Sequence, residues 1–541
     1  MEAFDRARSL AAMASEPYDV VVVGAGMTGA GVALDAASRG YRVALVESHD
    51  LGSGTTAKSS KMVHGGLRYL QQHEFRLVYE NLRERQRLLE NAPHLVRPLP
   101  FLIPMDGSQR VTGHALRQGY GAALWLYDIT GGWRIGERHH RVTPEQLHHL
   151  LPAVSPAHLR GGFSYLDARG DDTRVALAAS RTAALDYGAD VANYLTATGF
   201  ERGADGRVRA VTARDERTGA VLSIATRSVV NAAGVWSDEV RQLVDGDAAP
   251  VITPAKGVHL VVPRHRLEMA SAAVLGARGG RIIFVIPFED APYVYFGTTD
   301  TPYQGSLDDP LCTPDDVAYL LETVNQWTAN ELTPADVTGL WAGLRPLLAP
   351  SGRRTSVRTT DLSRRYRVVD DGAGVVNVTG GKWTTYRQMS QDAVDALAPY
   401  LGERPCRTAH LPLRGAGPFA PSTPLEARLQ RRYGDETPAL TAMIADDPSL
   451  AEIAIPGQDY CRAEILYAVR AEMAVTLEDV LERRTRAHLH DARATAAAAH
   501  DVAHLIGGEL GWEDADCDQA AEDYRKHARH EFAAAGIPWD R

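Results

Sequence analysis

The sequence predicts an α/β protein in which a mainly parallel sheet is interrupted by a second, largely antiparallel sheet, with a helical domain towards the C-terminal end. Three observations support this prediction. An apolar run, a glycine-rich turn and a helical pattern follow one another over residues 18–39. Short strand-like runs recur over residues 191–297, and the order of strand, glycine and helix returns at 374–396. Beyond Pro424 the chain is charged and helical.

The first unit has the pattern of a nucleotide-binding strand, turn, helix and strand. A β-branched strand stops at Gly24, a helix covers residues 28–39, and a second strand ends on Glu47. Gly24 permits a tight turn, Gly26 lets the backbone approach a pyrophosphate, and Gly29 lets the helix pack closely on the strand. Free N–H groups at the helix start and an acid for the ribose complete an adenine-dinucleotide site. The residues expected to contact the cofactor are Gly24, Gly26, Met27, Thr28, Gly29 and Glu47.

The next segment, residues 52–69, is rich in hydroxyl groups, glycines and cations and has no apolar periodicity. This composition suits a backbone that lies along a phosphate-bearing cofactor, although a solvated loop has the same composition. Its position just beyond the ribose-binding acid favours the cofactor. The predicted contacts are Thr55, Thr56, Ser59, Ser60, Lys61, His64, Gly65 and Gly66.

The middle of the chain alternates helices and short strands. Residues 73–90 predict an exposed amphipathic helix and residues 173–187 a second helix. Strands are expected at 191–198, 207–213, 220–226, 228–234, 258–262, 281–287 and 292–297. The nucleotide-binding domain is therefore expected to be discontinuous, with a substrate domain inserted into it. The expected ranges are 17–100, 160–245 and 345–400 for the first domain, 101–159 and 246–344 for the second, and 413–541 for the helical domain.

A second glycine-rich block, residues 377–387, precedes the last helix of the first domain. Its paired glycines lead into a threonine-rich helix start, which would direct free N–H groups at an anion. In a flavoenzyme this anion would be the N1–C2=O edge of the reduced ring. A helix cap in which the glycines serve only the turn is the alternative. The predicted contacts in this block are Gly381, Lys382, Thr384 and Thr385, and Gly234 at the end of the expected strand 228–234 is a further predicted contact.

Bulk composition excludes several classes of protein. The 541 residues exceed one simple core, and 45% apolar with 23% charged residues describe a globular protein. The net charge of −10 argues against a nucleic-acid binder. The four cysteines form no CxxC pair, so neither a disulfide framework nor a metal site is predicted, and a reducing cytoplasm fits. No apolar run is long enough to span a bilayer, so any membrane contact would be peripheral.

Three segments have further interpretations. The first seventeen residues are expected to form a short mobile lead-in. Residues 115–135 combine tryptophans, leucines and arginines, which suits insertion into a membrane interface but equally a buried helix. Residues 463–486 are expected to form one helix whose apolar face packs inside the C-terminal domain or serves a homodimer or another partner.

Several longer motifs resemble those of the FAD-dependent, quinone-linked glycerol-3-phosphate dehydrogenases. They lie at 60–69 (SKMVHGGLRY), 74–78 (EFRLV), 92–95 (APHL), 229–236 (VVNAAGVW), 256–259 (KGVH), 297–300 (GTTD), 343–347 (GLRPL) and 380–387 (GGKWTTYR). The resemblance extends from Tyr18 to about Arg486. It implies a D-amino-acid-oxidase-like flavoprotein fold, with a Rossmann-like FAD domain, a substrate domain with a mixed sheet and a helical cap.

The same resemblance implies FAD as the cofactor, glycerol 3-phosphate as the substrate, dihydroxyacetone phosphate as the product and a membrane quinone as the electron acceptor. The enzyme would be cytoplasmic, with peripheral attachment to the cytoplasmic face of the membrane as a further expectation. Cationic side chains would hold the dianionic substrate, because a guanidinium binds phosphate oxygens in a bidentate manner. The implied ligands are Arg68, Tyr69, Arg345, Arg364 and Lys382, with Arg365 an equal alternative to Arg364.

His259 is expected to remove the hydroxyl proton while hydride leaves C2 for the flavin N5, because an imidazole titrates near the working pH. A hydrogen-bonded structural histidine is the alternative. Arg345 would stabilise the alkoxide. Competing functions are an oxidase that uses O₂, an amine or amino-acid oxidase of the same fold, and a non-enzymatic FAD-binding protein. The glycine turn alone is also compatible with NAD.

Overall fold

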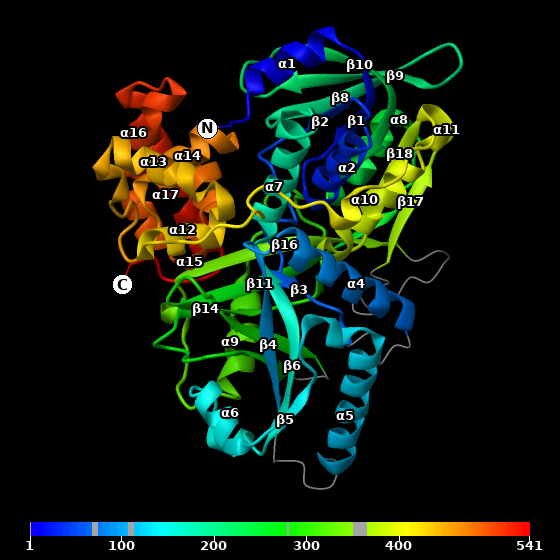
Figure 1. Ribbon diagram of the computed structural model, residues 1–541. Helices are drawn as coiled ribbons and strands as arrows, with labels where there is room; N and C mark the ends of the chain where they lie inside the picture. The colour runs from blue at the N-terminus through cyan, green and yellow to red at the C-terminus, as the bar shows by residue number, and fades with distance from the viewer. Residues whose placement is uncertain (1, 68–73, 106–112, 278–280, 350–364, 541) are drawn as a thin grey trace.

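The computed structural model describes residues 2–67, 74–105, 113–277, 281–349 and 365–540 (Figure 1). It has three parts: a first sheet with its helices, a second sheet below it in Figure 1, and a group of helices beside both. The predicted fold class is therefore confirmed. In the described part of the chain, no helix is both long and apolar enough to cross a membrane.

The first sheet has eight strands and a parallel centre. Its order is β17-β18-β10-β1-β2-β7, and β8 and β9 extend it from β10. β1 pairs in parallel with β2 and β10, and β10 pairs in parallel with β18. Three separate stretches of chain thus build one sheet. Its strands are β1 (Tyr18–Val23), β2 (Val43–Val46), β7 (Asp190–Ala192), β8 (Leu195–Arg202), β9 (Val208–Asp215), β10 (Val221–Asn231), β17 (Tyr366–Asp370) and β18 (Val375–Gly380).

Both faces of this sheet are covered, which explains the unbroken apolar run in β1. Val20 and Val22 belong to the core on one face, and Val21 and Val23 to the core on the other. The first core is closed by α2 (Met27–Ser38), α7 (Asp172–Leu185) and α10 (Tyr386–Asp395). The second is closed by α1 (Arg6–Ser15) and α8 (Ser237–Val244). A short helix, α11 (Ala398–Leu401), follows α10.

The first seventeen residues were predicted to form a mobile lead-in. This prediction is wrong, because residues 6–15 form α1. The side chain of Asp5 caps this helix by accepting a hydrogen bond from the N–H of Arg8. Met13 is buried against the sheet, and Arg6 forms an ion pair of 2.6 Å with Asp215. The partners of α1 are distant in the sequence, so its mixed charge alone did not reveal it.

The second sheet has ten strands and is mostly antiparallel. Its order is β15-β11-β14-β13-β12-β4-β6-β3, with β16 also paired to β11 and β5 to β6. The strands are β3 (Met62–Val63), β4 (Val96–Pro104), β5 (His140–Val142), β6 (Gly162–Gly170), β11 (Ile252–Pro263), β12 (Ala272–Gly276), β13 (Ile282–Pro287), β14 (Tyr293–Gly297), β15 (Thr301–Pro302) and β16 (Gly339–Leu348). Around it lie α4 (Phe75–Asn91), α5 (Gly113–Thr130), α6 (Pro144–Leu150) and α9 (Pro314–Asn325).

Strand pairing moves the expected domain boundaries. β3, β4, β6 and the end of β16 pair within the second sheet, although the sequence assigns most of their residues to the first domain. In β4, Pro98, Pro100 and Pro104 suggest chain breaks. These prolines are an even number of residues apart, so their nitrogens all point to the same side of the strand, away from the β6 ladder. The ladder therefore needs no N–H group at these positions, and the strand tolerates them.

The helices beside the second sheet are amphipathic. α4 buries Val78 and Leu82 and exposes Tyr79. α5 buries Tyr127 and exposes Ile129, so this helix is buried on one face only, and insertion of the other face into a membrane stays a prediction.

The C-terminal part is helical, as predicted, but residues 463–486 are not one helix. α14 ends at Glu472 because Met473 adopts a left-handed φ of +58°, and a short π-helix (Asp479–Arg484) follows. Ile465 and Leu481 nevertheless lie in the core of this domain, which confirms their internal packing. The helices are α12 (Pro424–Tyr433), α13 (Thr437–Asp446), α14 (Arg462–Glu472), α15 (Ala487–His490), α16 (Ala492–Leu510) and α17 (Asp514–Ala534).

Candidate active site

A cavity of about 720 Å³ joins the two sheets. On one side it is bordered by the carboxyl ends of β1, β2, β10 and β18, the edge at which parallel α/β sheets bind ligands. On the other side it reaches β11 and β16 of the second sheet. The cavity therefore suits a ligand that extends from one domain into the other.

The glycine turn after β1 is closely packed. A Cβ atom at Gly29 would lie 1.7 Å from the carbonyl oxygen of Gly24, so only glycine lets α2 pack this near to the turn. Gly24 itself has a left-handed φ of +99°. Gly29 supports the turn from behind and does not line the cavity. The predicted residues here that do line it are Gly24, Gly26, Met27 and Thr28.

Glu47, at the end of β2, lies in the cavity wall and is tied to the turn. Its carboxylate accepts hydrogen bonds from the N–H groups of Ala25 (2.6 Å) and His49 (3.0 Å). Burial raises the pKa of this carboxyl group, and the two N–H groups oppose the rise. A ribose hydroxyl at this point could donate to the same carboxylate.

The loop after β2 crosses from the first sheet to the second. The hydroxyl of Thr55 donates to a carbonyl oxygen of β16 (2.6 Å), and Thr56 Oγ1 accepts a hydrogen bond from the first N–H of α2 (2.9 Å). Ser60 Oγ lies 2.9 Å from Nε2 of His259 on β11. One loop thus links the glycine turn to both strands of the far wall. The predicted loop residues that line the cavity are Thr55, Thr56, Ser59, Ser60 and His64.

Lys61, Gly65 and Gly66 were predicted to contact the cofactor, but in the structure they do not line the cavity. Lys61 Nζ is buried and donates to Asp172 Oδ1 (2.9 Å) at the start of α7. The N–H of Gly65 donates to the hydroxyl oxygen of Tyr127 (3.0 Å). Gly66 has a φ of +80°. Their contacts shape the loop rather than face the ligand.

His259 and Arg345 come together on one face of the second sheet. Gly257 and His259 are two residues apart on β11, so they face the same side. Arg345, on β16, lies over Gly257, where a Cβ atom would be 2.4 Å from its guanidinium. Both side chains line the cavity. The structure thus brings together the two residues that the sequence predicts to be catalytic.

The ring of His259 is buried and stacks on Trp341, with 4.8 Å between the ring centroids. Gly297 faces the ring closely, since a Cβ atom there would lie 2.4 Å from it. Burial, together with the charges of Arg345 and Lys61, lowers the pKa of His259 well below 6.5. The imidazole is therefore uncharged near neutral pH and carries a lone pair on one ring nitrogen. Its Nδ1 is buried and has no hydrogen-bond partner among the described residues.

The guanidinium of Arg345 is held by the backbone around it. It donates to Thr298 Oγ1 (3.0 Å) and to the carbonyl oxygens of Thr299 (3.2 Å) and Lys256 (3.3 Å). Asp300 Oδ1 lies 3.5 Å away. The motifs at 256–259 and 297–300 therefore position this cation at the cavity.

The second glycine block also borders the cavity. β18 ends at Gly380, and Gly381 follows it; their φ angles are +77° and +88°. A single 3₁₀ turn then leads into α10. The predicted residues of this block that line the cavity are Gly381, Lys382 and Thr384. Gly234, in the turn after β10, lines it as well. Thr385 does not, because its hydroxyl turns back to the carbonyl oxygen of Lys382 (3.2 Å).

Three predicted substrate ligands, Arg68, Tyr69 and Arg364, lie outside the described residues. Arg365, the alternative to Arg364, forms an ion pair with Glu74 and does not line the cavity.

Other side chains in the cavity wall were not predicted. Lys58 and Trp383 lie inside the two recognised blocks, so a search of those blocks for every large or charged side chain would have found them. Trp236 also lines the cavity and donates to Asp308 (2.9 Å). No sequence signal reveals this contact, because it joins segments 72 residues apart.

Comparison with known proteins identifies the family. Residues 19–387 match the FAD dependent oxidoreductase family, and residues 406–517 match the C-terminal domain of alpha-glycerophosphate oxidase. The chain is 40% identical to glycerol-3-phosphate dehydrogenase 2 of Mycobacterium tuberculosis, over 98% of this chain and 91% of that protein. The chain belongs to the FAD-dependent glycerol-3-phosphate dehydrogenase family. A human member, the mitochondrial glycerol-3-phosphate dehydrogenase, is 33% identical over 95% of this chain and 74% of its own length.

Solved structures agree with this assignment. The glycerol-3-phosphate dehydrogenase of Bacillus halodurans complexed with FAD has a TM-score of 0.78 and 27% identity, and the match covers 99% of this chain and 98% of that one. L-alpha-glycerophosphate oxidase of Mycoplasma pneumoniae shares the fold, with a TM-score of 0.54 and 18% identity over 75% of this chain and all of that one. The resemblance, the fold and the FAD cofactor inferred from the sequence are confirmed.

The cavity of this family member suits FAD in its chemistry. Gly26 leaves room beside the start of α2, where a Cβ atom would lie 3.2 Å from Thr56 Oγ1. Glu47 offers an acceptor for ribose hydroxyls at the end of β2. Gly381 and Thr384, at the 3₁₀ turn before α10, border the same cavity and could face the flavin ring. Glu47 would hold the adenosine portion, Gly26 the pyrophosphate, and Gly381 with Thr384 the flavin ring.

Proposed function

We propose that this protein oxidises sn-glycerol 3-phosphate to dihydroxyacetone phosphate with FAD. The supporting observation is the cavity that joins the glycine turn of β1 to His259 and Arg345 on the second sheet. The names of its relatives support the choice of substrate. FAD, when bound, supplies the N5 atom that accepts hydride from C2 of the substrate.

The charges in the cavity suit a phosphate ester. The chain carries a net charge of −10, yet Lys58, Arg345 and Lys382 all line the cavity. A phosphate monoester carries about 1.5 to 2 negative charges near neutral pH and needs such cations. By family resemblance, Arg68, Tyr69 and Arg364 would add to this set.

His259 would act as the base and Arg345 as the electrostatic partner. The His259 ring is neutral, so it has a lone pair for the hydroxyl proton of the substrate. Arg345, on the same face of the sheet, would stabilise the negative oxygen as that proton leaves. Loss of the hydroxyl proton and of the hydride from C2 would together convert the C2–OH group into a carbonyl.

For the electron acceptor we propose a membrane quinone, with O₂ as the alternative. The match of residues 406–517 to an oxidase domain is the observation that favours O₂. Peroxide formed per substrate oxidised, compared with reduction of a soluble quinone analogue, separates the two. One peroxide per substrate, with no reduction of the analogue, would replace the quinone with O₂.

A quinone acceptor requires contact with a membrane, and we propose α5 as the contact of a peripheral cytoplasmic enzyme. Trp125, Leu126 and Ile129 are exposed on this helix, and the exposed Trp133 follows it. Arg134 lies 5.2 Å from the ring centroid of Tyr79 on α4, which is also exposed. Apolar and aromatic side chains beside arginines are typical of segments that lie in a membrane interface.

An anaerobic titration with glycerol 3-phosphate tests the proposed function. The purified protein should be yellow, and one equivalent of substrate should bleach the flavin absorbance. Glycine and proline are the control substrates, since an amine or amino-acid oxidase of this fold would be bleached by compounds of that class instead. A flavoprotein that no such substrate bleaches would be non-enzymatic, and a protein that takes up no FAD would refute the proposal altogether.

A further inference from the structure

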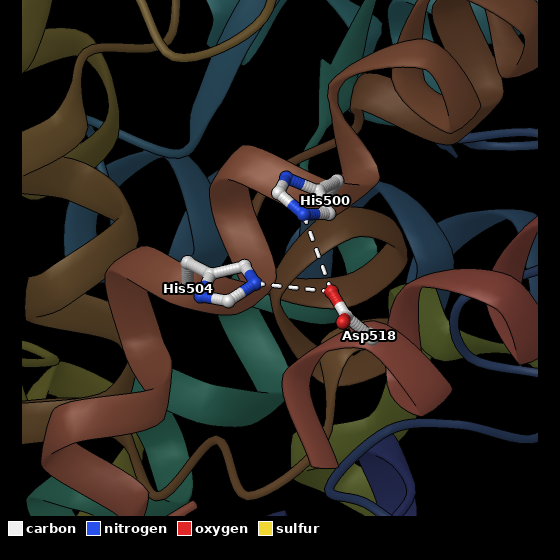
Figure 2. A group of neighbouring side chains, drawn as sticks. All are labelled: His500, His504 and Asp518. Carbon is white, nitrogen blue, oxygen red and sulfur yellow. Dashed lines mark hydrogen bonds and ion pairs between the residues drawn. The ribbon is translucent and has the colours of Figure 1, made fainter. Parts of the chain in front are cut away.

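Two histidines and an aspartate form a separate cluster on the surface of the C-terminal domain (Figure 2). His500 and His504 are four residues apart on α16 and therefore share one face of the helix. Asp518 faces them from α17. None of these three residues lines the cavity between the sheets, so the cluster needs its own explanation.

The side-chain atoms of this cluster have the spacing of metal ligands. Nε2 of His500 and Nε2 of His504 each lie 3.2 Å from Oδ1 of Asp518. The three possible ligand atoms lie within 4.8 Å of one another. Ligands about 2.0–2.2 Å from a tetrahedral Zn²⁺ ion are roughly 3.3–3.6 Å apart, so small rotations of these exposed side chains would admit the ion.

The other ring nitrogens also face carboxylates. Nδ1 of His500 lies 3.3 Å from Asp501 Oδ1. Nδ1 of His504 lies 3.7 Å from Asp514 Oδ1. A histidine that binds a metal commonly directs its other N–H at a carboxylate, which fixes the tautomer and strengthens the ligating nitrogen. With the protons on Nδ1, both Nε2 atoms and the Asp518 oxygen direct lone pairs at one region, and a cation between them would stabilise that arrangement.

We propose that His500, His504 and Asp518 bind a divalent transition-metal ion, with Zn²⁺ as the representative. Two imidazoles and one carboxylate favour such an ion over Mg²⁺ or Ca²⁺, which prefer oxygen ligands. The side chains of His500 and Asp518 are 50% and 63% exposed, so water can complete the coordination. This site departs from the sequence expectation of no metal, because its ligands come from two helices and contain no cysteine.

The bound ion would join the two longest helices of the C-terminal domain. α16 and α17 are connected by a short turn and already pack together, with a Cβ atom at Gly507 of α16 placed 2.4 Å from Cys517 Sγ of α17. Ligands from both helices make metal binding favour the folded domain. The ion would thus stabilise the domain and take no part in substrate oxidation.

Calorimetric titration of the FAD-loaded protein with ZnCl₂ tests this proposal, and the melting temperature gives a second readout. The wild type should bind Zn²⁺ at this site and melt at a higher temperature in its presence. His504→Gln and Asp518→Asn should each bind at least about tenfold more weakly and lose the rise in melting temperature. His530→Gln, an exposed histidine of α17 outside the cluster, is the matched control and should behave as the wild type.

Equal Zn²⁺ affinity in the wild type, His504→Gln and Asp518→Asn would overturn the proposal, because the zinc would then bind elsewhere. Failure of the wild type to bind Zn²⁺ at millimolar concentration would overturn it as well. The melting temperatures without metal check the folding of each variant, and because the substituted side chains are at the surface, these temperatures should match that of the wild type.

Discussion

The surroundings of His259 favour an uncharged ring. Burial and the charges of Arg345 and Lys61 all disfavour the imidazolium. If His259 is the base, a proton taken from the substrate would therefore be held weakly and would have to move on. The hydroxyl of Ser60, 2.9 Å from Nε2, offers a hydrogen-bonded route within the described residues. His259 thus suits a base that relays its proton.

This environment makes a prediction about pH. At saturating substrate, the rate of flavin reduction should not fall as the pH is lowered through 6.5, because the pKa of His259 lies well below that value and the ring stays unprotonated. Anaerobic single-turnover reduction between about pH 5.5 and 8 measures this rate. His259→Gln should slow reduction roughly 10²–10⁴-fold. An acid limb near 6.5 that disappears in His259→Gln would contradict the lowered pKa, and unchanged reduction in the variant would exclude His259 as the base.

Arg345 gives a second prediction at the residue scale. Arg345→Ala should abolish turnover while FAD remains bound, because the guanidinium contacts β11 and the 297–300 segment and not the glycine turn. Turnover and the ratio of flavin to protein absorbance measure the two effects. Arg345→Lys is the matched control: it keeps the charge but loses the guanidinium fork, so its activity should be intermediate. Near-normal turnover of Arg345→Ala would refute this role.

Residues could be predicted where their role depends on their neighbours in the chain. The glycine turn and Glu47 meet this condition, because strand, turn, helix and acid lie within thirty residues of one another. Lys61 does not, since the sequence suggests a cofactor cation whereas its partner is Asp172, 111 residues further on. Burial of that pair cannot be read from the composition of a loop.

At the scale of elements, the close packing of α2 on the glycine turn leaves no room for a side chain at position 29. Gly29→Ala would place a Cβ atom 1.7 Å from the carbonyl oxygen of Gly24, so α2 would have to move away from the turn. We expect protein with little bound FAD, destabilised by about 1–3 kcal/mol or more. Flavin absorbance per protein and the melting temperature measure both effects.

Gly508→Ala is the matched control for this prediction. It is the same substitution inside a helix, α16, at a position where a Cβ atom meets nothing within 4 Å. It should retain FAD and gain up to about 1 kcal/mol of stability, because alanine is the better helix former. Normal FAD loading in Gly29→Ala would show that the close contact is not required.

Helices and strands were predictable where a single apolar periodicity runs through the whole element. The parallel strands and the long C-terminal helices follow this rule. β4 does not, because its prolines suggest a break while its pairing with β6 makes it a strand. The helix break at Met473 also has no signal in the sequence. Met473 adopts a left-handed backbone although it is not a glycine, and the apolar residues on either side suit one continuous helix.

At the scale of the molecule, buried ion pairs join the C-terminal domain to the nucleotide-binding domain. Arg484 forms an ion pair of 2.6 Å with Asp50, which lies three residues beyond Glu47. Glu472 forms another of 2.6 Å with Arg174 of α7. Removing one member of a buried pair is costly, so these contacts fix the docking of the two domains. The C-terminal domain thereby supports the loop that lines the cavity.

One helix also connects the proposed membrane face to this loop. Tyr127 and Ile129 are two residues apart on α5 and lie on different sides of it. The hydroxyl of Tyr127 accepts a hydrogen bond from the N–H of Gly65 and donates one to Asp167 (2.6 Å), whereas Ile129 is 73% exposed. If α5 docks on a membrane, the loop that contains Gly65 and borders the cavity would therefore be held near the lipid surface.

Replacing Trp125 and Ile129 together by serine should weaken binding to vesicles of phosphatidylcholine and phosphatidylglycerol by about tenfold or more. Burial of each large apolar side chain contributes up to about 1.5–3 kcal/mol, and 1.4 kcal/mol corresponds to a factor of ten. Co-sedimentation measures the binding. Val221→Ser, at an exposed apolar position on β10, is the matched control and should bind as the wild type. Flavin reduction by glycerol 3-phosphate should be unchanged in both variants, while reduction of quinone in the vesicles should fall only in the double variant. Equal vesicle binding by the double variant would mean that another surface meets the membrane.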